Sequence, residues 1–313
     1  MAKGIGIILV VMGHCGGCLP LQALLSSFHM PLFFFLSGLF LFNKEETASA
    51  FLRRKAKTLL FPCLVFGFIL CTYSTSIDLF RHDSTIPYGL RYVGLFINMR
   101  HNPFPGSLWF FPCLFIVEVL MFVVHWCSKK KVLMLLMAMS FVVLGLIIHN
   151  TYGKGLPWSI DIALYCVIFT MVGYWSKKTV WKKRPLVTYI FAFIILLTSV
   201  YMNYQYSGDT VDLYSCRIGC YPLFFVSAFA GIYLSIGFAK LWVENKILIY
   251  FGQNSMLVYS VHFLFLLLVT KTIGMILPSG IISNIVEVSI IFIILVPIIN
   301  AINAHFKWMT GKF

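Results

Sequence analysis

Two histidines lie inside apolar stretches near the start of this chain. His14 lies within the run 4–21, and His29 lies near the start of the run 28–43. An ionisable side chain within an apolar, membrane-length segment costs free energy to bury, and it is therefore a candidate functional group. Histidine titrates near neutral pH, so each ring can serve as a general base or as a nucleophile that carries a group between two substrates.

The spacing of Lys3 and His14 places both on one helical face. They are eleven positions apart, and eleven steps of about 100° end only about 20° past three full turns. The same residues rise roughly 16 Å, which sets His14 near mid-membrane if Lys3 is at the inner headgroups. Gly6 and Gly13 form nearly one stripe, where another backbone or a ligand can come close. The alternative is a buried His14 that only hydrogen-bonds to a neighbouring helix.

The depth of His29 matches that of His14. His29 lies fourteen residues before Asn43, which is roughly 21 Å along a helix and within about one turn of the level of His14. We therefore predict that both imidazoles face one polar cavity, reached from the inner face past Lys3 and Arg54. The alternative for His29 is an N-terminal cap or a hydrogen bond at the outer boundary.

Two carboxylates and a third histidine extend this set. Glu118 lies in the middle of an apolar run, where an unpaired charge is costly, so it either orients an imidazole or forms a purely structural ion pair. Asp161 lies nearer a helix end, where hydration favours a structural role. His262 follows Tyr259 in another apolar run and is a further candidate for the cavity.

The elements that position these residues are membrane-spanning helices. Of the 313 residues, 60% are hydrophobic and 11% are charged, whereas an ordinary soluble domain is about 25% charged. A spanning helix uses roughly 20 apolar residues. We therefore predict an all-α polytopic membrane protein with about ten transmembrane helices, forming a single domain over residues 1–313. The apolar runs are 4–21, 28–43, 59–80, 108–127, 132–149, 159–175, 186–204, 220–240, 248–270 and 280–300.

Clumps of basic residues between the apolar runs account for much of the net charge of +14. The clumps lie at 53–57, 129–131 and 177–184. We predict that both termini are cytoplasmic, because eighteen of the 24 lysines and arginines then fall on the inner side, as the positive-inside rule favours. The charge therefore indicates a multi-pass protein of the cell membrane, in contact with lipid and without a nucleic-acid partner. The polar connection 81–107 is predicted to be an outer loop that forms part of a lid.

Four blocks of sequence carry a resemblance to a known family. They are residues 3–14, 28–38, 107–112 and 252–256. The first contains the basic residue and histidine at eleven-residue spacing, and the second opens with Phe28-His29-Met30-Pro31 and ends with Ser37-Gly38. Together they resemble the acyltransferase 3 family of integral membrane O-acyltransferases, and within it the fucose 4-O-acetyltransferase-like members are the most similar.

The resemblance implies a reaction. It implies transfer of an acyl group, usually acetyl from acetyl-CoA, to a sugar hydroxyl of a cell-surface or lipid-linked glycan. His14 takes the position of the family's motif histidine, as general base or as acyl carrier. His29 and Glu118 complete our predicted catalytic set. The sequence does not choose between direct transfer and a covalent acetyl-imidazole.

The resemblance also implies a donor site for the polyanionic coenzyme A. The family's two basic positions fall on Lys3 and on the pair Arg54 and Lys57. Lysine stands at two positions where many members carry arginine, and its ammonium lacks the bidentate fork that fits phosphate. The alternative is that these residues only set topology and contact anionic lipid. Acetyl-CoA is expected as a substrate, and no tightly bound cofactor is expected.

Nine cysteines raise the question of metal and disulfide chemistry. Cys15 and Cys18 form a single CxxC after His14, whereas a structural zinc site needs four ligands, so we predict no metal. Cys216 and Cys220 are expected on the same outer side, which leaves a disulfide among these four cysteines open. The other five cysteines are typical of apolar packing.

The main alternative function is a multi-span transporter or flippase of a glycan or small solute. Transporters often contain two halves with matching broken helices, and no such pair is evident in this sequence. The acceptor sugar, its hydroxyl position, the acyl chain length, the oligomeric state and the completeness of the N-terminus stay open at this point.

Overall fold

The chain folds almost entirely into helices. The computed structural model describes residues 1–15, 18–42, 46–81, 87–100, 108–152, 155–242 and 244–311. The chain is 81% helical, and the described residues contain no strand beyond an isolated bridge between Asp212 and Arg217. In this part of the chain, nine helices are long and apolar enough to cross a membrane. The prediction of an all-α polytopic membrane protein is confirmed.

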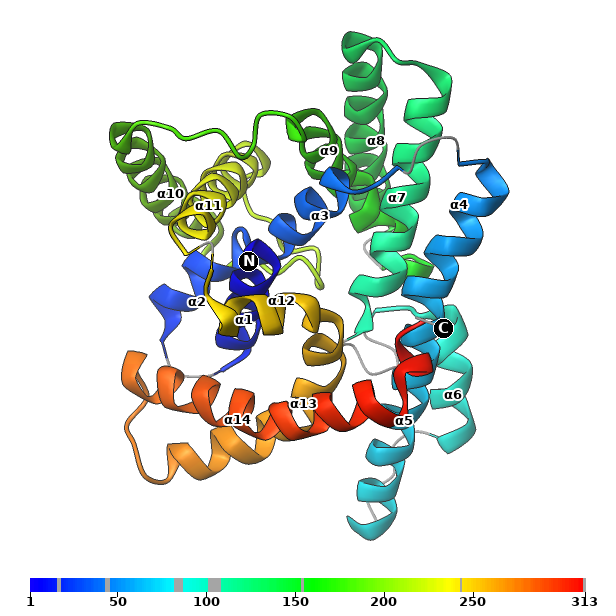
Figure 1. Ribbon diagram of the computed structural model, residues 1–313, viewed down its shortest axis with the longest axis vertical. Coiled ribbons are helices and arrows are strands. Elements are labelled where there is room, and N and C mark those ends of the chain that lie inside the picture. The colour runs from blue at the N-terminus through cyan, green and yellow to red at the C-terminus, as the bar shows by residue number, and fades with distance from the viewer. Residues whose placement is uncertain are drawn as a thin grey trace. The chain divides into compact units, whose positions relative to one another are not determined.

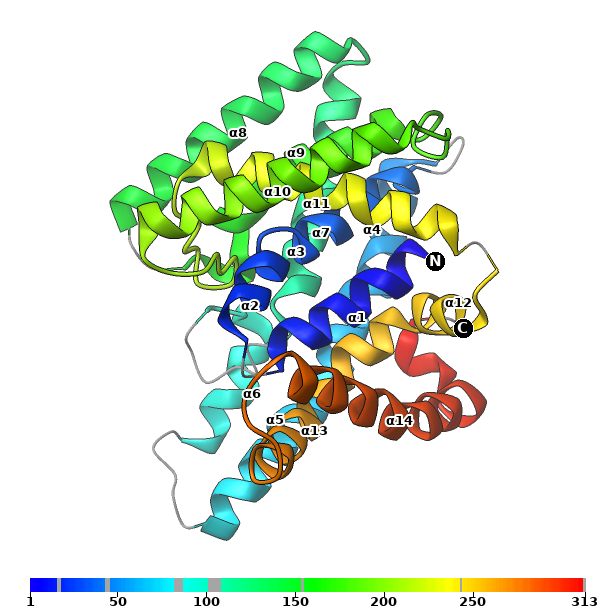
Figure 2. The same cartoon turned by 90° about the vertical axis from the view of Figure 1, so that its left-hand side faces the viewer.

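The chain divides into two compact units, of which unit 1 comprises residues 1–40 and 172–300. In this unit α1 packs against its sequence neighbours α2 and α3 and against α11, α12 and α13. Helices α10 and α11 lie side by side in both views (Figure 1, Figure 2). The helices are α1 (Ala2–His14), α2 (Leu19–Ser26), α3 (His29–Leu39), α10 (Leu186–Ser207), α11 (Tyr221–Leu241), α12 (Lys246–Gln253), α13 (Ser255–Gly274) and most of α14 (Ile281–His305).

Unit 2 comprises residues 41–171 and 301–313. Its first helices follow one another without a break and form one apolar helical segment of 34 residues. Helix α7 packs against both η1 and η3. The elements are α4 (Ala48–Lys55), the π-helical η1 (Ala56–Leu60), α5 (Phe61–Arg81), α6 (Tyr88–Ile97), α7 (Phe110–Cys127), α8 (Lys131–Tyr152), the 3-10 helix η3 (Pro157–Ser159), most of α9 (Ile160–Ser176) and η4 (Lys307–Thr310). The single domain over 1–313 stays a prediction.

The first predicted span, 4–21, is wrong as one helix. Helix α1 ends at His14, because Cys15 adopts an extended conformation with φ −71° and ψ 134°. A new helix begins at Leu19 with Pro20 in its first turn, a position where proline is tolerated because its missing N–H has no intrahelical partner anyway. The apolar span of 21 residues here is Leu19–Leu39, formed by α2 and α3 together.

Three further boundaries differ from the sequence prediction. The predicted loop 44–58 contains α4, whose first turn is capped by Thr47 Oγ1 accepting from the Ala50 amide at 3.3 Å. The predicted span 248–270 is interrupted at Asn254, whose side chain donates to the Tyr250 carbonyl at 2.8 Å and so competes with the helical ladder. The predicted outer loop contains α6, while 82–86 and 101–107 lie outside the described residues, as does Asn43.

Glycines bring the helices of unit 1 into close contact. A Cβ atom built on Gly4 would lie 2.0 Å from the Leu248 carbonyl oxygen, so α1 and α12 approach at backbone distance there. A Cβ on Gly6 would lie 3.1 Å from the Phe33 ring, and one on Gly13 3.9 Å from His29 Cε1. The glycine stripe predicted from the sequence therefore faces the segment that carries His29.

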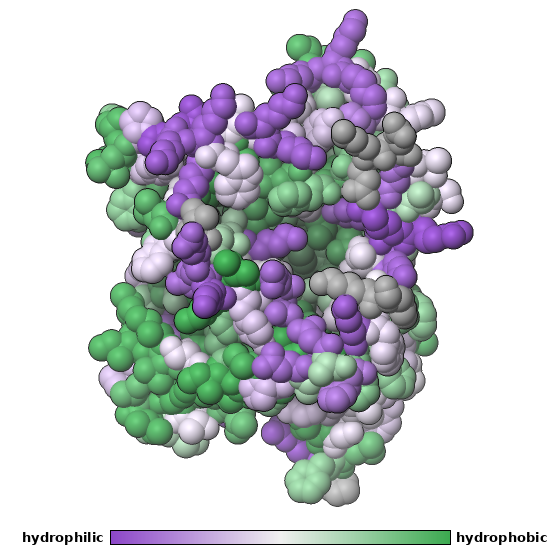
Figure 3. Space-filling model, viewed as in Figure 1, coloured by the Kyte–Doolittle hydropathy of each residue, from purple (hydrophilic) through white to green (hydrophobic). Residues whose placement is uncertain are grey.

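Several long helices present apolar side chains outward. Only 22% of the α8 window and 22% of the α10 window is buried. Figure 3 shows hydrophobic surface gathered over α13 and α14, at the lower left, where Ile281, Ile282 and Ile293 are exposed. Such surfaces are unfavourable in water and are expected where helices contact lipid.

Candidate active site

His14 stands at the carboxyl end of α1, among other imidazoles. Its ring centroid lies 5.5 Å from that of His262 on α13 and 4.8 Å from that of Phe263. His14 also interacts electrostatically with His262 and His29. The His14 side chain retains exposed surface, whereas His29 is 9% exposed and His262 is fully buried at 0%. Unit 1 therefore holds three neighbouring histidines, one of them accessible.

Backbone carbonyls fix the orientation of the two buried histidines. His29 Nδ1 donates to the Leu25 carbonyl at 2.6 Å, and His262 Nδ1 lies 3.0 Å from the Val258 carbonyl and 2.9 Å from the Tyr259 carbonyl. Because a carbonyl oxygen can only accept, the proton of each neutral ring resides on Nδ1 and the lone pair on Nε2. The Nε2 of His262 is buried without a hydrogen-bond partner. Each of these rings therefore presents a basic nitrogen.

A carboxylate that sequence reasoning missed lies beside this cluster. Glu287 on α14 interacts with the thiol of Cys15, the residue next to His14. It is 4% exposed, and its Oε2 has no partner. Asn284, one turn earlier, is 0% exposed, and neither Oδ1 nor Nδ2 of its side chain has a hydrogen-bond partner. The signal was present, because Glu287 interrupts an apolar run in the same way as Glu118 does.

Lys3 lies at the other end of α1. It is exposed, and the backbone around it is held by the close approach of Gly4 to Leu248 and of Gly252 to the Gly4 nitrogen, where a Cβ on Gly252 would lie 3.0 Å away. All residues from Lys3 to His14 are helical. Both residues therefore lie on one continuous helix, as the spacing predicts.

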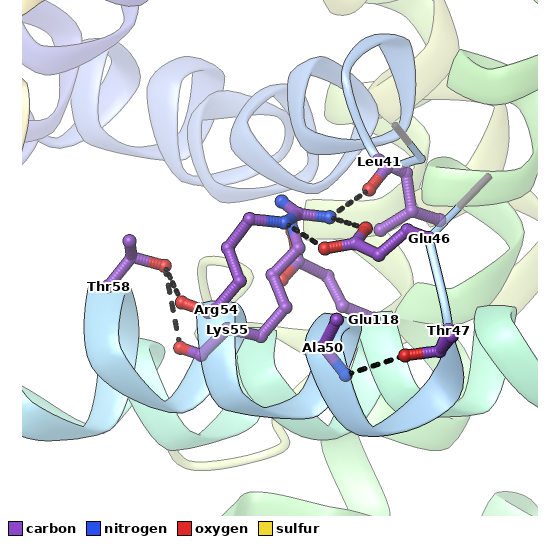
Figure 4. A network of polar contacts seen from close by, with 8 residues as sticks. All are labelled: Leu41, Glu46, Thr47, Ala50, Arg54, Lys55, Thr58 and Glu118. Atoms are coloured by element: carbon purple, nitrogen blue, oxygen red, sulfur yellow. Dashed lines mark hydrogen bonds and ion pairs between the residues drawn. The ribbon is translucent and has the colours of Figure 1, made fainter. Parts of the chain in front are cut away.

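Arg54 lies in a network of polar contacts in unit 2. Figure 4 shows its guanidinium meeting the Glu46 carboxylate in a bidentate pair, with Nε donating at 2.7 Å and Nη2 at 2.6 Å. Nη2 also donates to the Leu41 carbonyl at 3.1 Å. The guanidinium carbon lies 5.5 Å from the centre of the Phe51 ring. A bidentate pair has the geometry in which arginine holds a carboxylate or a phosphate.

The neighbours of Arg54 differ in exposure. Lys57, on η1, is exposed. Lys55 is buried, and its Nζ donates to Glu118 Oε1 at 2.8 Å. Glu118 is therefore half of a buried ion pair within unit 2. The catalytic role of Glu118 stays a prediction. The alternative given in the sequence analysis was a purely structural ion pair, and such a pair is present with Lys55.

The remaining sequence candidates are Asp161 and the cysteines. Asp161 is paired with Arg100 in unit 2. In the part of the chain that the structure describes, no disulfide joins Cys15 or Cys18 to Cys216 or Cys220. Within the described ranges, histidine, cysteine, aspartate and glutamate side chains form no group of three that could hold a metal ion.

The predicted site residues thus fall into two sets. His14, His29 and Lys3 belong to unit 1, and Arg54, Lys57 and Glu118 belong to unit 2. A family model described as an acyltransferase domain matches residues 1–303 and so runs through both units. No curated protein and no solved structure matches the chain.

Proposed function

Since the chain belongs to the acyltransferase 3 family and is a multi-pass membrane acyltransferase, we propose that it acetylates a sugar hydroxyl of a cell-surface or lipid-linked glycan, with cytoplasmic acetyl-CoA as the donor. The family membership favours this enzyme over the transporter or flippase. The acetyl donor, the glycan acceptor, the cell membrane and the fucose 4-O-acetyltransferase-like subtype are parts of the proposal.

The observation that carries the proposal is the histidine cluster of unit 1. Transfer to an alcohol requires a base that removes the hydroxyl proton as the oxygen attacks the thioester carbonyl. His14 is the accessible member of the cluster, whereas His29 and His262 are buried and tethered by their Nδ1 atoms. His14 therefore acts as the base, and the two tethered rings supply a polar, uncharged surrounding. An acetyl-imidazole on His14 is the covalent variant of the same route.

Basic residues of α4 and η1 are proposed to bind the donor. Coenzyme A carries several phosphate charges. The Arg54 guanidinium forms a bidentate pair with Glu46, and the same geometry binds a phosphate group. Lys57 is exposed one turn further on. Lys3 is the exposed basic residue on the helix that ends in His14. Arg54 and Lys57 bind phosphates of the donor, and the assignment of Lys3 to the donor stays a prediction from the sequence.

A vectorial assay tests the proposal. The purified protein is reconstituted into sealed vesicles that enclose acetyl-CoA labelled in the acetyl group, and methyl glycosides are supplied outside. We expect labelled ester on the glycoside and one free thiol of coenzyme A per ester formed, with NMR of the product locating the acetylated hydroxyl. Empty vesicles and a His14→Ala protein serve as controls. Binding of acetyl-CoA without ester formation across acceptors would contradict the glycan acetyltransferase.

A further inference from the structure

A group of polar residues in unit 2 is used neither by the histidine cluster nor by the basic residues of α4. We name it the Arg100 cluster, after the one cationic side chain among its members. Two hydrogen bonds to backbone carbonyls bring its segments together, because the Trp158 amide donates to the Asn98 carbonyl at 3.0 Å and Trp158 Nε1 donates to the Phe96 carbonyl at 2.8 Å. Its members are Asn98, Arg100, Gly155, Trp158, Ser159 and Asp161.

The Arg100 cluster contains several buried polar atoms without partners. Arg100 is 7% exposed, and its Nε and Nη1 have no hydrogen-bond partner. The same holds for Asn98 Nδ2, on a residue 2% exposed, and for Ser159 Oγ, on a residue 0% exposed. Buried donors without partners are uncommon in native proteins because each has lost its hydrogen bonds to water. Four such atoms in two adjoining segments therefore indicate a site for a molecule that brings acceptors.

The backbone of the Arg100 cluster is held in an unfavourable conformation. Trp158 has φ 57°, Ser159 has φ 51° and Asn98 has φ 45°. Two consecutive residues other than glycine in the left-handed region are strained, and strain of this kind gathers at ligand-binding segments. The guanidinium of Arg100 also lies directly over Gly155, where a Cβ would come within 2.5 Å of Nε.

The charges of the Arg100 cluster favour an uncharged ligand. Arg100 Nη2 already donates to Asp161 Oδ2, so the buried pair is neutral as a whole. An anionic ligand would add an uncompensated charge in a buried place, which is costly. Hydroxyl and carbonyl oxygens accept from the free donors without that cost. The half-buried Trp158 ring adds an amphipathic aromatic surface beside them.

We propose that the Arg100 cluster binds the hydroxyl and carbonyl oxygens of an uncharged sugar and is a recognition subsite for the glycan acceptor. The subsite rests on the proposed function only in identifying the sugar as the acceptor. Arg100, Asn98 and Ser159 donate to the sugar oxygens, and Trp158 contacts the ring.

The test measures sugar binding without acetyl-CoA. Thermal unfolding of the full chain in detergent is followed against increasing concentrations of the methyl glycosides of glucose, galactose and N-acetylglucosamine, with methyl glucuronide as the anionic probe and sorbitol as the osmolyte control. We expect saturable stabilisation by at least one neutral glycoside. Ser159→Ala and Asn98→Gly should each weaken it by about tenfold. Ser140→Ala, on the exposed face of α8, is the matched control and should bind as the wild type does.

Both variants suit the test because they spare the fold. Ser159→Ala removes a hydroxyl that has no partner, and glycine is the residue best suited to the left-handed backbone at position 98. A large loss of unfolding temperature without sugar would mean that these groups have structural partners, and it would overturn the subsite. The same conclusion follows if no glycoside stabilises the wild type, if only glucuronide does, or if both variants respond as the wild type does. Because this experiment measures sugar binding and not turnover, its failure would overturn the subsite and leave the proposed acetyl transfer untouched.

Discussion

The two units of the molecule bury polar groups in opposite ways. Among the described residues, every buried ion pair lies in unit 2, at Lys55 with Glu118, Arg91 with Asp78 and Arg100 with Asp161. In unit 1 the ion pairs of Arg217 are exposed at the surface. Its buried histidine and acidic side chains, among the described residues, are His29, His262 and Glu287.

This difference suits the two units to different functions. A buried neutral imidazole is inexpensive and can accept a proton during a reaction. A buried cation is costly unless a carboxylate accompanies it, and once paired it holds structure or recognises charge. Unit 1 is therefore equipped for proton transfer, and unit 2 for charged and hydrogen-bonding recognition. Four measurements test that division.

The largest effect is expected from His14→Ala. Removal of the base should lower the rate of acetyl transfer by about 10²- to 10⁴-fold, because general-base catalysis contributes on that scale. Unfolding temperature and membrane expression should stay near those of the wild type, because the His14 side chain retains exposed surface. His305→Ala, at the exposed end of α14, is the matched control. Retained turnover would remove His14 from the mechanism.

The next effect concerns the Lys55 and Glu118 pair. Glu118→Gln leaves Lys55 buried without its counter-charge, and breaking a buried pair costs about 3–5 kcal/mol of unfolding free energy. The reversed pair, Lys55→Glu with Glu118→Lys, should recover part of that stability in denaturant unfolding. If it recovers stability and transfer together, Glu118 is structural. Transfer that stays lost in a stable reversed protein would support its predicted catalytic role.

A smaller effect is expected at the donor site. Replacing both Arg54 and Lys57 with glutamine should raise the apparent KM for acetyl-CoA by about tenfold or more, since charge-assisted hydrogen bonds to phosphate are worth about 1.5–3 kcal/mol each. The KM for the acceptor should change less. Lys129→Gln with Lys130→Gln is a matched loss of two exposed inner charges. An unchanged KM for acetyl-CoA would contradict donor binding by Arg54 and Lys57 and would leave them only a role in membrane topology.

The smallest effect is a salt dependence of donor binding. Exposed charges are screened beyond a Debye length of about 8 Å at physiological ionic strength, so the donor KM should rise about two- to threefold as salt increases severalfold. The rate at saturating donor should stay constant, because the ion pairs among the described residues include no histidine of unit 1. If that rate falls with salt while both substrates remain saturating, an exposed charge pair contributes to the catalytic step itself.

Local sequence patterns predicted the long helices well and their interruptions poorly. The runs that became α7, α8, α9 and α10 differ by three residues or fewer from the helices in the structure, because twenty apolar residues have one stable conformation in a bilayer. The breaks at Cys15 and Asn254 depend on single residues within equally apolar surroundings, and hydropathy does not register them. Pro20 was the available signal for the first.

The candidate site shows the same contrast. Helical periodicity placed Lys3 and His14 on one helix, and the glycine stripe predicted the approach of His29. The contact of His14 with His262, and of Cys15 with Glu287, joins residues about 250 positions apart. One sequence alone does not contain that information, because it depends on how α13 and α14 pack against α1.

The π-helical turn η1 lets its segment tolerate one change in length. A π-turn holds more residues than an α-turn, so deleting one residue from Ala56–Leu60 lets the helix close into regular α geometry while α4 and α5 keep their relative rotation. Lys55 would then still face Glu118. Deleting one residue from α4 or α5 instead turns the preceding helix by about 100° relative to the following one. Among chains descended from this one, one-residue gaps in this segment should therefore gather within these five positions.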